Sequence, residues 1–290
     1  MKHVLAVSSF FLFAQGCTNK KADSGLDGQS GNSSNSGGAS LQPDDIEPES
    51  VTPVPVFEIT GILLDLAIAS DGRVFASNQE QAIEVWDPQT NWVTTHTDRA
   101  GPVFGVVWAS DALWYTTSHD RHAGALMKLN GRDPERIADA DGDTIFREPR
   151  DLCQAPDGSW VIADTTLSML FVISPDGSTV EPLSVPQSDL STVASDNTYI
   201  YAGGESGVIR IAWPNGPAET LDDRSVDGLH HANGILWGTN VDWGVFEVGG
   251  ERRLDLPEIR RAGRMVGNDP LLIADSTRGD VWSVSLSGIE

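Results

Sequence analysis

Short apolar runs alternate with polar turns along most of the chain, most clearly between residues 149 and 177. An apolar strand there leads into Pro156-Asp157-Gly158, a second strand follows as WVIAD, and a third reaches another Pro-Asp-Gly. Asp-Gly between apolar runs is typical of a hairpin turn, because glycine adopts a positive φ at little cost. The pattern predicts consecutive antiparallel strands.

Six units repeat this pattern, each with one turn after its first strand. The turns begin at Asp71, Asp111, Asp157, Asp196, Asn233 and Asp269. Their spacing is about 40 residues, and each unit has room for three or four short strands. The sequence therefore predicts an all-β fold, a six-bladed β-propeller spanning residues 54–290.

The sixth unit has no room for a fourth strand, because the sequence given stops soon after SVSL at 283–286. The run VPVFEIT at 54–60 precedes the first unit and has no partner within it. We expect it to supply the outer strand of the last blade. That arrangement closes the ring and removes a free sheet edge.

The units resemble those of NHL-repeat and SMP-30/gluconolactonase-like propellers. The third unit matches best, with Pro149, Asp157-Gly158, Ala163-Asp164 and Asp176-Gly177, and the sixth repeats Ala274-Asp275. The resemblance covers residues 55–290 and implies the propeller fold. It implies no single function, because propellers carry unrelated activities.

Acidic and amide side chains recur at matching positions of the units. They are Asp65, Asp151 and Asp227 before the turns, Asn78, Asp164 and Asn240 thirteen residues later, and Asp275 in the last unit. In a hairpin the start of one strand lies beside the end of the next, so these residues are predicted to form a ring of oxygen ligands at one rim of the channel. Ca²⁺ takes six to eight such oxygens. The tentative metal ligands are Asp65, Asp151, Asp227 and Asn240.

A structural role is the alternative for part of this ring. Asp164 and Asp275 end second strands, where a carboxylate commonly accepts hydrogen bonds from neighbouring backbone amides. Arg150 and Arg264 lie next to the ring in the sequence, where their charges would neutralise it.

The resemblance to SMP-30-like enzymes implies a catalytic metal at this rim, held by Glu, Asn and Asp from first strands. Asp227-Gly228-Leu229 matches the family's Asp-Gly-hydrophobic segment, and Asp65 stands where the Glu is expected. The Asn falls on Arg150, a cation, and this departure counts against lactone hydrolysis. Asp227 and His230 are the candidate catalytic residues, with His230 as a base; a hydrogen-bonded structural histidine is the alternative.

Two loops offer weaker metal sites. His119 and His122 lack a third ligand at a spacing typical of zinc. The acidic loop at 139–143 lacks the glycine and glutamate that a calcium-binding loop requires, so we expect it to be a solvated loop.

Residues 1–16 resemble a bacterial lipoprotein signal peptide. Lys2 precedes an apolar run too short to span a bilayer, and Ala14-Gln15-Gly16-Cys17 resembles a lipobox in which Cys17 is lipidated. An ordinary signal peptide cut nearby is the alternative. Residues 17–53 are rich in Gly, Ser and acidic residues and predict a disordered tether. Thr18 and Asn19 follow the cysteine, and the resemblance to Gram-negative lipoproteins implies the outer membrane.

The net charge of −23 at pH 7 makes nucleic acid an unlikely partner, because so acidic a protein repels phosphate backbones. Cys153, the one cysteine besides Cys17, lies in an apolar strand and is expected to act as a buried hydrophobe.

These patterns predict an extracytoplasmic, lipid-anchored propeller that serves as a scaffold for an unknown protein or small-molecule ligand. Its working face is expected at the rim that carries Asp65, Asp151 and Asp227. The alternative is a divalent-metal-dependent hydrolase of the SMP-30 type, acting on a lactone or ester, with Ca²⁺ as the candidate cation.

Overall fold

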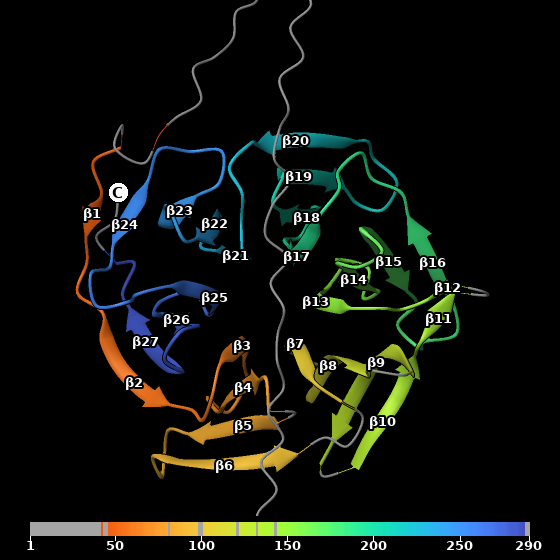
Figure 1. Ribbon diagram of the computed structural model, residues 1–290, viewed down its shortest axis with the longest axis horizontal. Coiled ribbons are helices and arrows are strands. Elements are labelled where there is room, and N and C mark those ends of the chain that lie inside the picture. The colour runs from red at the N-terminus through yellow and green to blue at the C-terminus, as the bar shows by residue number, and fades with distance from the viewer. Residues whose placement is uncertain are drawn as a thin grey trace, which may run out of the picture. The chain divides into compact units, whose positions relative to one another are not determined.

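The computed structural model describes residues 42, 46–80, 82–97, 101–119, 122–131, 133–141 and 144–287. The predicted signal peptide, Cys17 and most of the predicted tether lie outside these residues. Six sheets stand around a central axis as the blades of a propeller, and their first strands are innermost (Figure 1). The predicted six-bladed architecture is confirmed. None of the described residues belongs to a helix that could cross a membrane.

The strands of blades 1–6 follow the chain order, with one addition in each of the last two blades. Blade 1 holds β3 (Leu63–Ile68), β4 (Val74–Asn78), β5 (Ala82–Asp87) and β6 (Trp92–Thr97). Blade 2 holds β7 (Val103–Ala109), β8 (Ala112–His119), β9 (His122–Asn130) and β10 (Asp133–Ala138). Blade 3 holds β13 (Pro149–Gln154), β14 (Trp160–Asp164), β15 (Met169–Ile173) and β16 (Val180–Leu183). Blade 4 holds β17 (Leu190–Ser195), β18 (Tyr199–Gly204), β19 (Gly207–Ala212) and β20 (Ala218–Asp222). Blade 5 holds β21 (Gly228–Ala232), β22 (Ile235–Asn240), β23 (Gly244–Glu247) and β24 (Arg253–Asp255). Blade 6 holds β25 (Ala262–Val266), β26 (Leu271–Asp275) and β27 (Asp280–Val284).

The outer strand of blade 6 comes from the other end of the fold. Strand β2 (Val54–Glu58) pairs antiparallel with β27, with Val54 opposite Ser283 and Glu58 opposite Asp280. The predicted closing strand is therefore confirmed. It joins the beginning and the end of the described chain in one sheet.

The predicted tether ends earlier than residue 53. Strand β1 (Glu49–Ser50) pairs parallel with β24 and adds a fifth strand to blade 5. Ile46 is 7% exposed and packs in the core between blades 4 and 5. The propeller thus begins near residue 46, because one isoleucine in this polar segment finds an apolar site between two blades.

A short hairpin separates blades 2 and 3, where the sequence predicted a solvated acidic loop. Strands β11 (Ala140–Asp141) and β12 (Thr144–Ile145) pair antiparallel. Asp139 beside it forms an exposed ion pair with Arg136 at 2.8 Å. Asp143 lies outside the described residues, so the loop as a whole is not defined by the structure.

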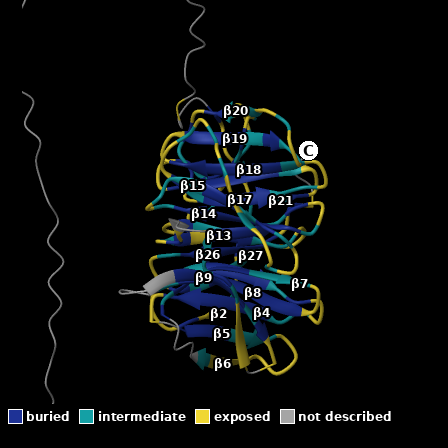
Figure 2. Cartoon of the chain, turned by 90° about the vertical axis from the view of Figure 1, so that its right-hand side faces the viewer, coloured by how far each residue is buried: buried dark blue, intermediate teal, exposed yellow. Residues whose placement is uncertain are grey.

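The core consists of six apolar layers, one between each pair of neighbouring blades. The layer between blades 1 and 2, for example, contains Phe75, Ile83, Leu113 and Tyr115. The layer between blades 2 and 3 contains Trp114 and Trp160, whose ring centroids lie 4.4 Å apart. The second strands of the blades are buried over most of their length, whereas exposed residues gather in the loops and on outer strands such as β2 and β10 (Figure 2). Each blade is therefore stabilised mainly by its two neighbours.

The hairpin turn of blade 3 shows why the Asp-Gly pattern recurs. Gly158 has a φ of +86°, which favours glycine. The Asp157 carboxylate accepts hydrogen bonds from the backbone nitrogen and the hydroxyl of Ser159, at 3.0 and 2.6 Å. The turn thus holds itself through local contacts.

Replacement of Ile46 by alanine should lower the free energy of unfolding by about 2–4 kcal/mol, because it opens a cavity in a closed apolar layer. Ile62→Ala is the matched control: Ile62 is 44% exposed, and its loss should cost no more than about 0.5 kcal/mol. Urea unfolding of the two variants checks this. Equal small losses would show that the segment before residue 54 does not belong to the fold.

Candidate functional site

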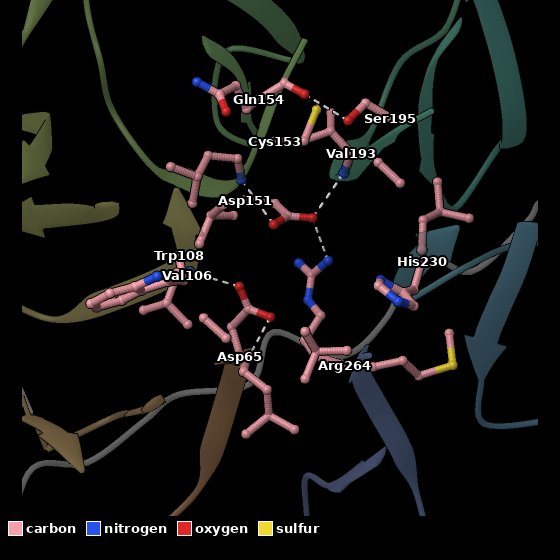
Figure 3. A pocket seen from close by; sticks show the side chains of 18 of the residues that line it. Asp65, Val106, Trp108, Asp151, Cys153, Gln154, Val193, Ser195, His230 and Arg264 are labelled. Atoms are coloured by element: carbon pink, nitrogen blue, oxygen red, sulfur yellow. Dashed lines mark hydrogen bonds and ion pairs between the residues drawn. The ribbon is translucent and has the colours of Figure 1, made fainter. Parts of the chain in front are cut away.

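The inner strands enclose a channel that contains two hollows. The first, the channel cavity, has a volume of about 290 Å³ and is lined by the later residues of the inner strands, including Trp108, Cys153 and His230 (Figure 3). The second, the channel mouth, has a volume of about 570 Å³ and lies where the inner strands begin. Arg264 lines both hollows, so its side chain marks the boundary between them.

Arg264 spans the channel. It belongs to β25 in blade 6, and its guanidinium bonds to the carboxylate of Asp151 in blade 3, on the opposite side of the ring. The same guanidinium donates to the hydroxyl of Thr192 and, at 3.1 Å, to the carbonyl oxygen of Ser191 in blade 4. One side chain therefore links three blades.

Asp151 is almost fully enclosed, with 4% of the residue exposed. Its Oδ1 accepts the backbone N–H of Leu152 at 2.8 Å, and its Oδ2 accepts the N–H of Val193 at 2.8 Å. The approach of its backbone to blade 2 requires glycine there: a Cβ on Gly105 would lie 2.9 Å from the Cα of Asp151. Asp151 thus joins blade 3 to blade 4 through backbone hydrogen bonds.

Asp65 repeats this arrangement in blade 1. Its Oδ1 accepts the N–H of Leu66 at 2.8 Å, and its Oδ2 accepts the N–H of Val106 in blade 2 at 2.7 Å. Both aspartates follow a register irregularity near the start of the inner strand. The irregularity directs each carboxylate toward the next blade.

The guanidinium of Arg264 bonds to Asp151 and acts on Asp65 through its charge. The pKa of Asp65 is raised to about 7, chiefly by burial and also by the charge of Asp151, whereas Arg264 and the two backbone amides limit the rise. Burial alone would lower the pKa of Arg264, but the carboxylates of Asp151 and Asp65 raise it. The Asp65 carboxyl is thus expected to keep its proton to a higher pH than an ordinary aspartate does.

Asp227 does not join the two buried aspartates. It lines the channel mouth, its side chain is 43% exposed, and it pairs with Arg261 at 3.3 Å. Strand β21 begins one residue later, at Gly228. Asp227 therefore precedes the strand and points to the mouth.

The residues predicted at the ends of second strands hold nearby loops instead of facing the channel. Asp164 accepts the N–H groups of Arg147 and Leu167, at 2.6 and 3.1 Å. Asp275 accepts those of Arg260 and Thr277, at 2.9 and 3.0 Å. These contacts agree with the structural alternative for both aspartates.

The two asparagines bond in the same manner. Asn240 accepts the N–H of Trp243 at 2.6 Å and donates to the carbonyl of Ser225 at 2.6 Å. Asn78 accepts the N–H of Ala82 at 3.2 Å and donates to the carbonyl of Thr60 at 3.0 Å. The predicted ring is therefore divided between the channel, its mouth and the loops.

A divalent cation does not fit the tentative ligands as they stand. Asp65 and Asp151 are engaged by backbone amides, and the guanidinium of Arg264 already supplies positive charge at Asp151. Asp227 and Asn240 have other partners. Among the side chains that the structure describes, no three His, Cys, Asp or Glu lie together as metal ligands would.

The candidate catalytic pair is also separated, because His230 lines the channel cavity and Asp227 the mouth. His230 Nε2 lies 2.6 Å from the carbonyl oxygen of Gly267. Burial lowers the pKa of His230, and the hydrogen bond to Gly267 opposes this effect. The contact agrees with a hydrogen-bonded structural histidine.

The remaining candidates add no further chemistry. His119 and His122 are opposite each other at the end of the β8–β9 hairpin, but their side chains and Asp120 lie outside the described part of the chain. Cys153 is buried, and burial raises the pKa of its thiol, so the thiol stays protonated at neutral pH. Its predicted role as a small buried residue agrees with this position.

Two features of the site were missed by sequence reasoning. Arg261 lines the mouth beside Asp227, and Thr192 bonds to both Asp151 and the N–H of Leu229. The cluster Arg260-Arg261-Ala-Gly-Arg264 in a chain with few cations was the available signal for the first. Thr192 carried no comparable signal.

The sequence matches no protein-family profile and no curated protein. Solved structures share its fold. A candidate gluconolactonase is 18% identical, with 85% of this chain and 96% of that chain covered, at a TM-score of 0.68. A virginiamycin B lyase from Staphylococcus aureus is 10% identical, with 81% and 99% covered, at a TM-score of 0.60. The PQQ-bound aldose sugar dehydrogenase from Streptomyces coelicolor is 14% identical, with 82% and 99% covered, at a TM-score of 0.58. At these identities the similarity establishes the propeller fold alone.

Asp65→Asn should change how stability depends on pH. The folded protein holds a proton on Asp65 up to a pKa of about 7, whereas the unfolded chain releases it near the ordinary value of 3.8. Between these values the folded state binds more protons, so this group lowers the free energy of unfolding by about 1.4 kcal/mol per pH unit as pH rises. The variant should therefore gain stability relative to the wild type between pH 5 and pH 7, as measured by urea unfolding.

Asp176→Asn is the control for this measurement. Hydrogen bonds from Ser174 and Ser178 lower the pKa of Asp176 to about 2, below the window. Its stability difference from the wild type should stay constant across that window. The same constant difference for Asp65→Asn would contradict the assigned protonation of Asp65.

Proposed function

We propose that this propeller is an extracytoplasmic, lipid-anchored binding protein that takes a small molecule in its channel mouth. The hollow of about 570 Å³ at the mouth carries the proposal. Binding sites for small molecules are concave and have volumes of about 300–1,000 Å³. The mouth combines apolar Ile62, Leu64 and Phe104 with polar Gln79 and Ser191, a mixture suited to holding and orienting a ligand.

The closed floor of the mouth supports the same function. The side chain of Arg264 crosses the channel beneath the mouth and bonds to the buried carboxylate of Asp151 and the buried hydroxyl of Thr192. A ligand that enters therefore meets a preformed polar surface. Preformed sites lose little affinity to ordering of the protein.

The alternative function, a metal-dependent lactone or ester hydrolase, has less support in this site. Its metal ligands would be Asp65, Asp151, Asp227 and Asn240, whose oxygens already have other partners. Arg150 stands where the resemblance requires Asn. We therefore derive no hydrolytic step and favour binding without catalysis.

A blocked mouth should abolish ligand binding. Gln79 is exposed and lines the mouth, so Gln79→Trp places a large ring in the hollow. In a thermal-shift screen of small molecules, a compound present at about 100 times its Kd should add about 2.7 kcal/mol of stability. For a domain of this size that is a rise in Tm of about 5–10 °C, which Gln79→Trp should remove.

Gln89→Trp provides the matched control. Gln89 is also exposed, but it lies in the turn between β5 and β6 and does not line the mouth. This variant should respond to the compound as the wild type does. Equal responses of all three proteins would place the ligand outside the mouth and reject the proposed function.

Cys17→Ser should release the protein from membranes if Cys17 is the lipidated residue. Without the thiol there is no attachment point for lipid, and the tether itself has too little apolar surface to bind a bilayer. Fractionation of cells that express the full chain, with mass spectrometry of the N-terminal peptide, measures this. Cys153→Ser is the control and should leave fractionation unchanged; membrane association of Cys17→Ser would contradict the anchor.

A further inference from the structure

We propose that the ligand of the channel mouth is a small anion, recognised through a carboxylate or phosphate group by the exposed side chains of Arg150 and Arg261, with the charge of Arg264 beneath them. This inference rests on the proposed function, because it specifies the chemistry of a ligand at the same site. Both groups present oxygen pairs to which a guanidinium donates two parallel hydrogen bonds.

The charge of the mouth carries the inference. The chain has a net charge of −23, yet three arginines line this one hollow, and among the described residues that line it Asp227 is the one carboxylate. Glu148 and Asp151 compensate part of the positive charge from behind Arg150 and Arg264. The groups that face the hollow are nevertheless mainly cationic.

The arginines come from opposite sides of the ring. Arg150 belongs to β13 in blade 3, whereas Arg261 and Arg264 belong to the start of blade 6 (Figure 1). A ligand in the mouth therefore lies between Arg150 from blade 3 and Arg261 from the start of blade 6, above the guanidinium of Arg264, which crosses to blades 3 and 4. That arrangement favours an elongated anion, or one that carries more than one oxygen-rich group.

Arg150 is held in place and retains a free donor. Its Nε and Nη2 bond to Glu148 Oε1, at 2.8 and 2.6 Å, and its guanidinium stacks on the ring of Phe104 at 5.1 Å. Within the described residues its Nη1 has no partner. The side chain is 43% exposed, so a ligand can reach it.

Arg261 is the more available donor. The one hydrogen bond of its guanidinium among the described residues runs from Nη2 to Asp227 at 3.3 Å, a long bond between two half-exposed side chains. Exposed pairs of this kind contribute about 0–1 kcal/mol, so an incoming anion can replace Asp227 as the partner. Asp227 is thus expected to compete with the ligand.

The test is isothermal titration of the full chain with succinate and with inorganic phosphate, at low ionic strength to limit screening. The wild type should bind at least one probe saturably, with a Kd on the order of 1 mM. Arg261→Gln should weaken binding at least about tenfold, and Asp227→Asn should strengthen it about threefold, because it removes the competing carboxylate.

Arg210→Gln is the matched control. Arg210 is also half-exposed and paired with one carboxylate, Glu219 at 3.0 Å, but it lies on β19 away from the mouth. It should bind the probes as the wild type does. Binding of phosphate alone would identify phosphorylated ligands, and binding of succinate alone would identify carboxylates; either result supports the inference.

Three results would overturn the inference. They are the absence of saturable binding at about ten times the expected Kd, equal affinities of Arg261→Gln and Arg210→Gln, and Ca²⁺ binding that Asp227→Asn abolishes. The proposed function fails separately. If Gln79→Trp blocks an uncharged compound that Arg261→Gln still binds, the mouth is a ligand site and only its anion preference is wrong.

Discussion

The hydrogen-bonded ion pair between Arg264 and Asp151 is the contact on which the centre of this protein depends. In a propeller the inner strands leave an axial gap that apolar layers between the blades do not fill. Here one arginine crosses the gap and bonds to groups in blades 3 and 4. Removal of either partner would leave a buried charge uncompensated. The free-energy cost of that unpaired charge is much larger than the net stabilisation that the intact pair provides.

The same contact determines the distribution of charge in the channel. The positive charge that a metal would bring is already supplied in part by a side chain, and the carboxylates around it already accept backbone N–H groups. The channel is therefore divided into an inner cavity and an open mouth. In this chain the chemistry at the boundary of the two hollows is that of a guanidinium group among carboxylates and backbone amides.

Much of the fold could be predicted because each blade is encoded locally. A turn such as Asp157-Gly158 fixes two strands, and six repeats of that signal fix the ring; the partner of β2 then follows because one edge remains. Strand β1 could not be predicted, since two residues of a polar segment carry no periodicity. The burial of Ile46 depends on a gap between blades 4 and 5 that no local pattern describes.

The site was predictable only where it follows strand register. Asp65 and Asp151 occupy equivalent positions in blades 1 and 3 and make equivalent contacts with the next blade. Asp227 lies at the same distance from its turn as these two aspartates but in a different environment. Strand β21 begins one residue after it, and its half-exposed side chain pairs with Arg261. The contact of Arg264 with Asp151 across the ring depends on tertiary structure. Its position in the sequence, close to the predicted acidic residues, suggested that it neutralises their charge but could not identify Asp151 as its partner.

The closure of blade 6 by β2 also has a kinetic consequence. Strand β2 precedes every other strand of the ring except β1 in chain order, whereas its partner β27 follows every other strand of the six blades. The ring cannot close until all six blades have been made, and among the strand pairings of the described residues this one closes the longest loop. Folding of such non-local contacts is slow. Until then the edge of β27 is open to other chains, so the last step of folding is also the step most exposed to misassembly.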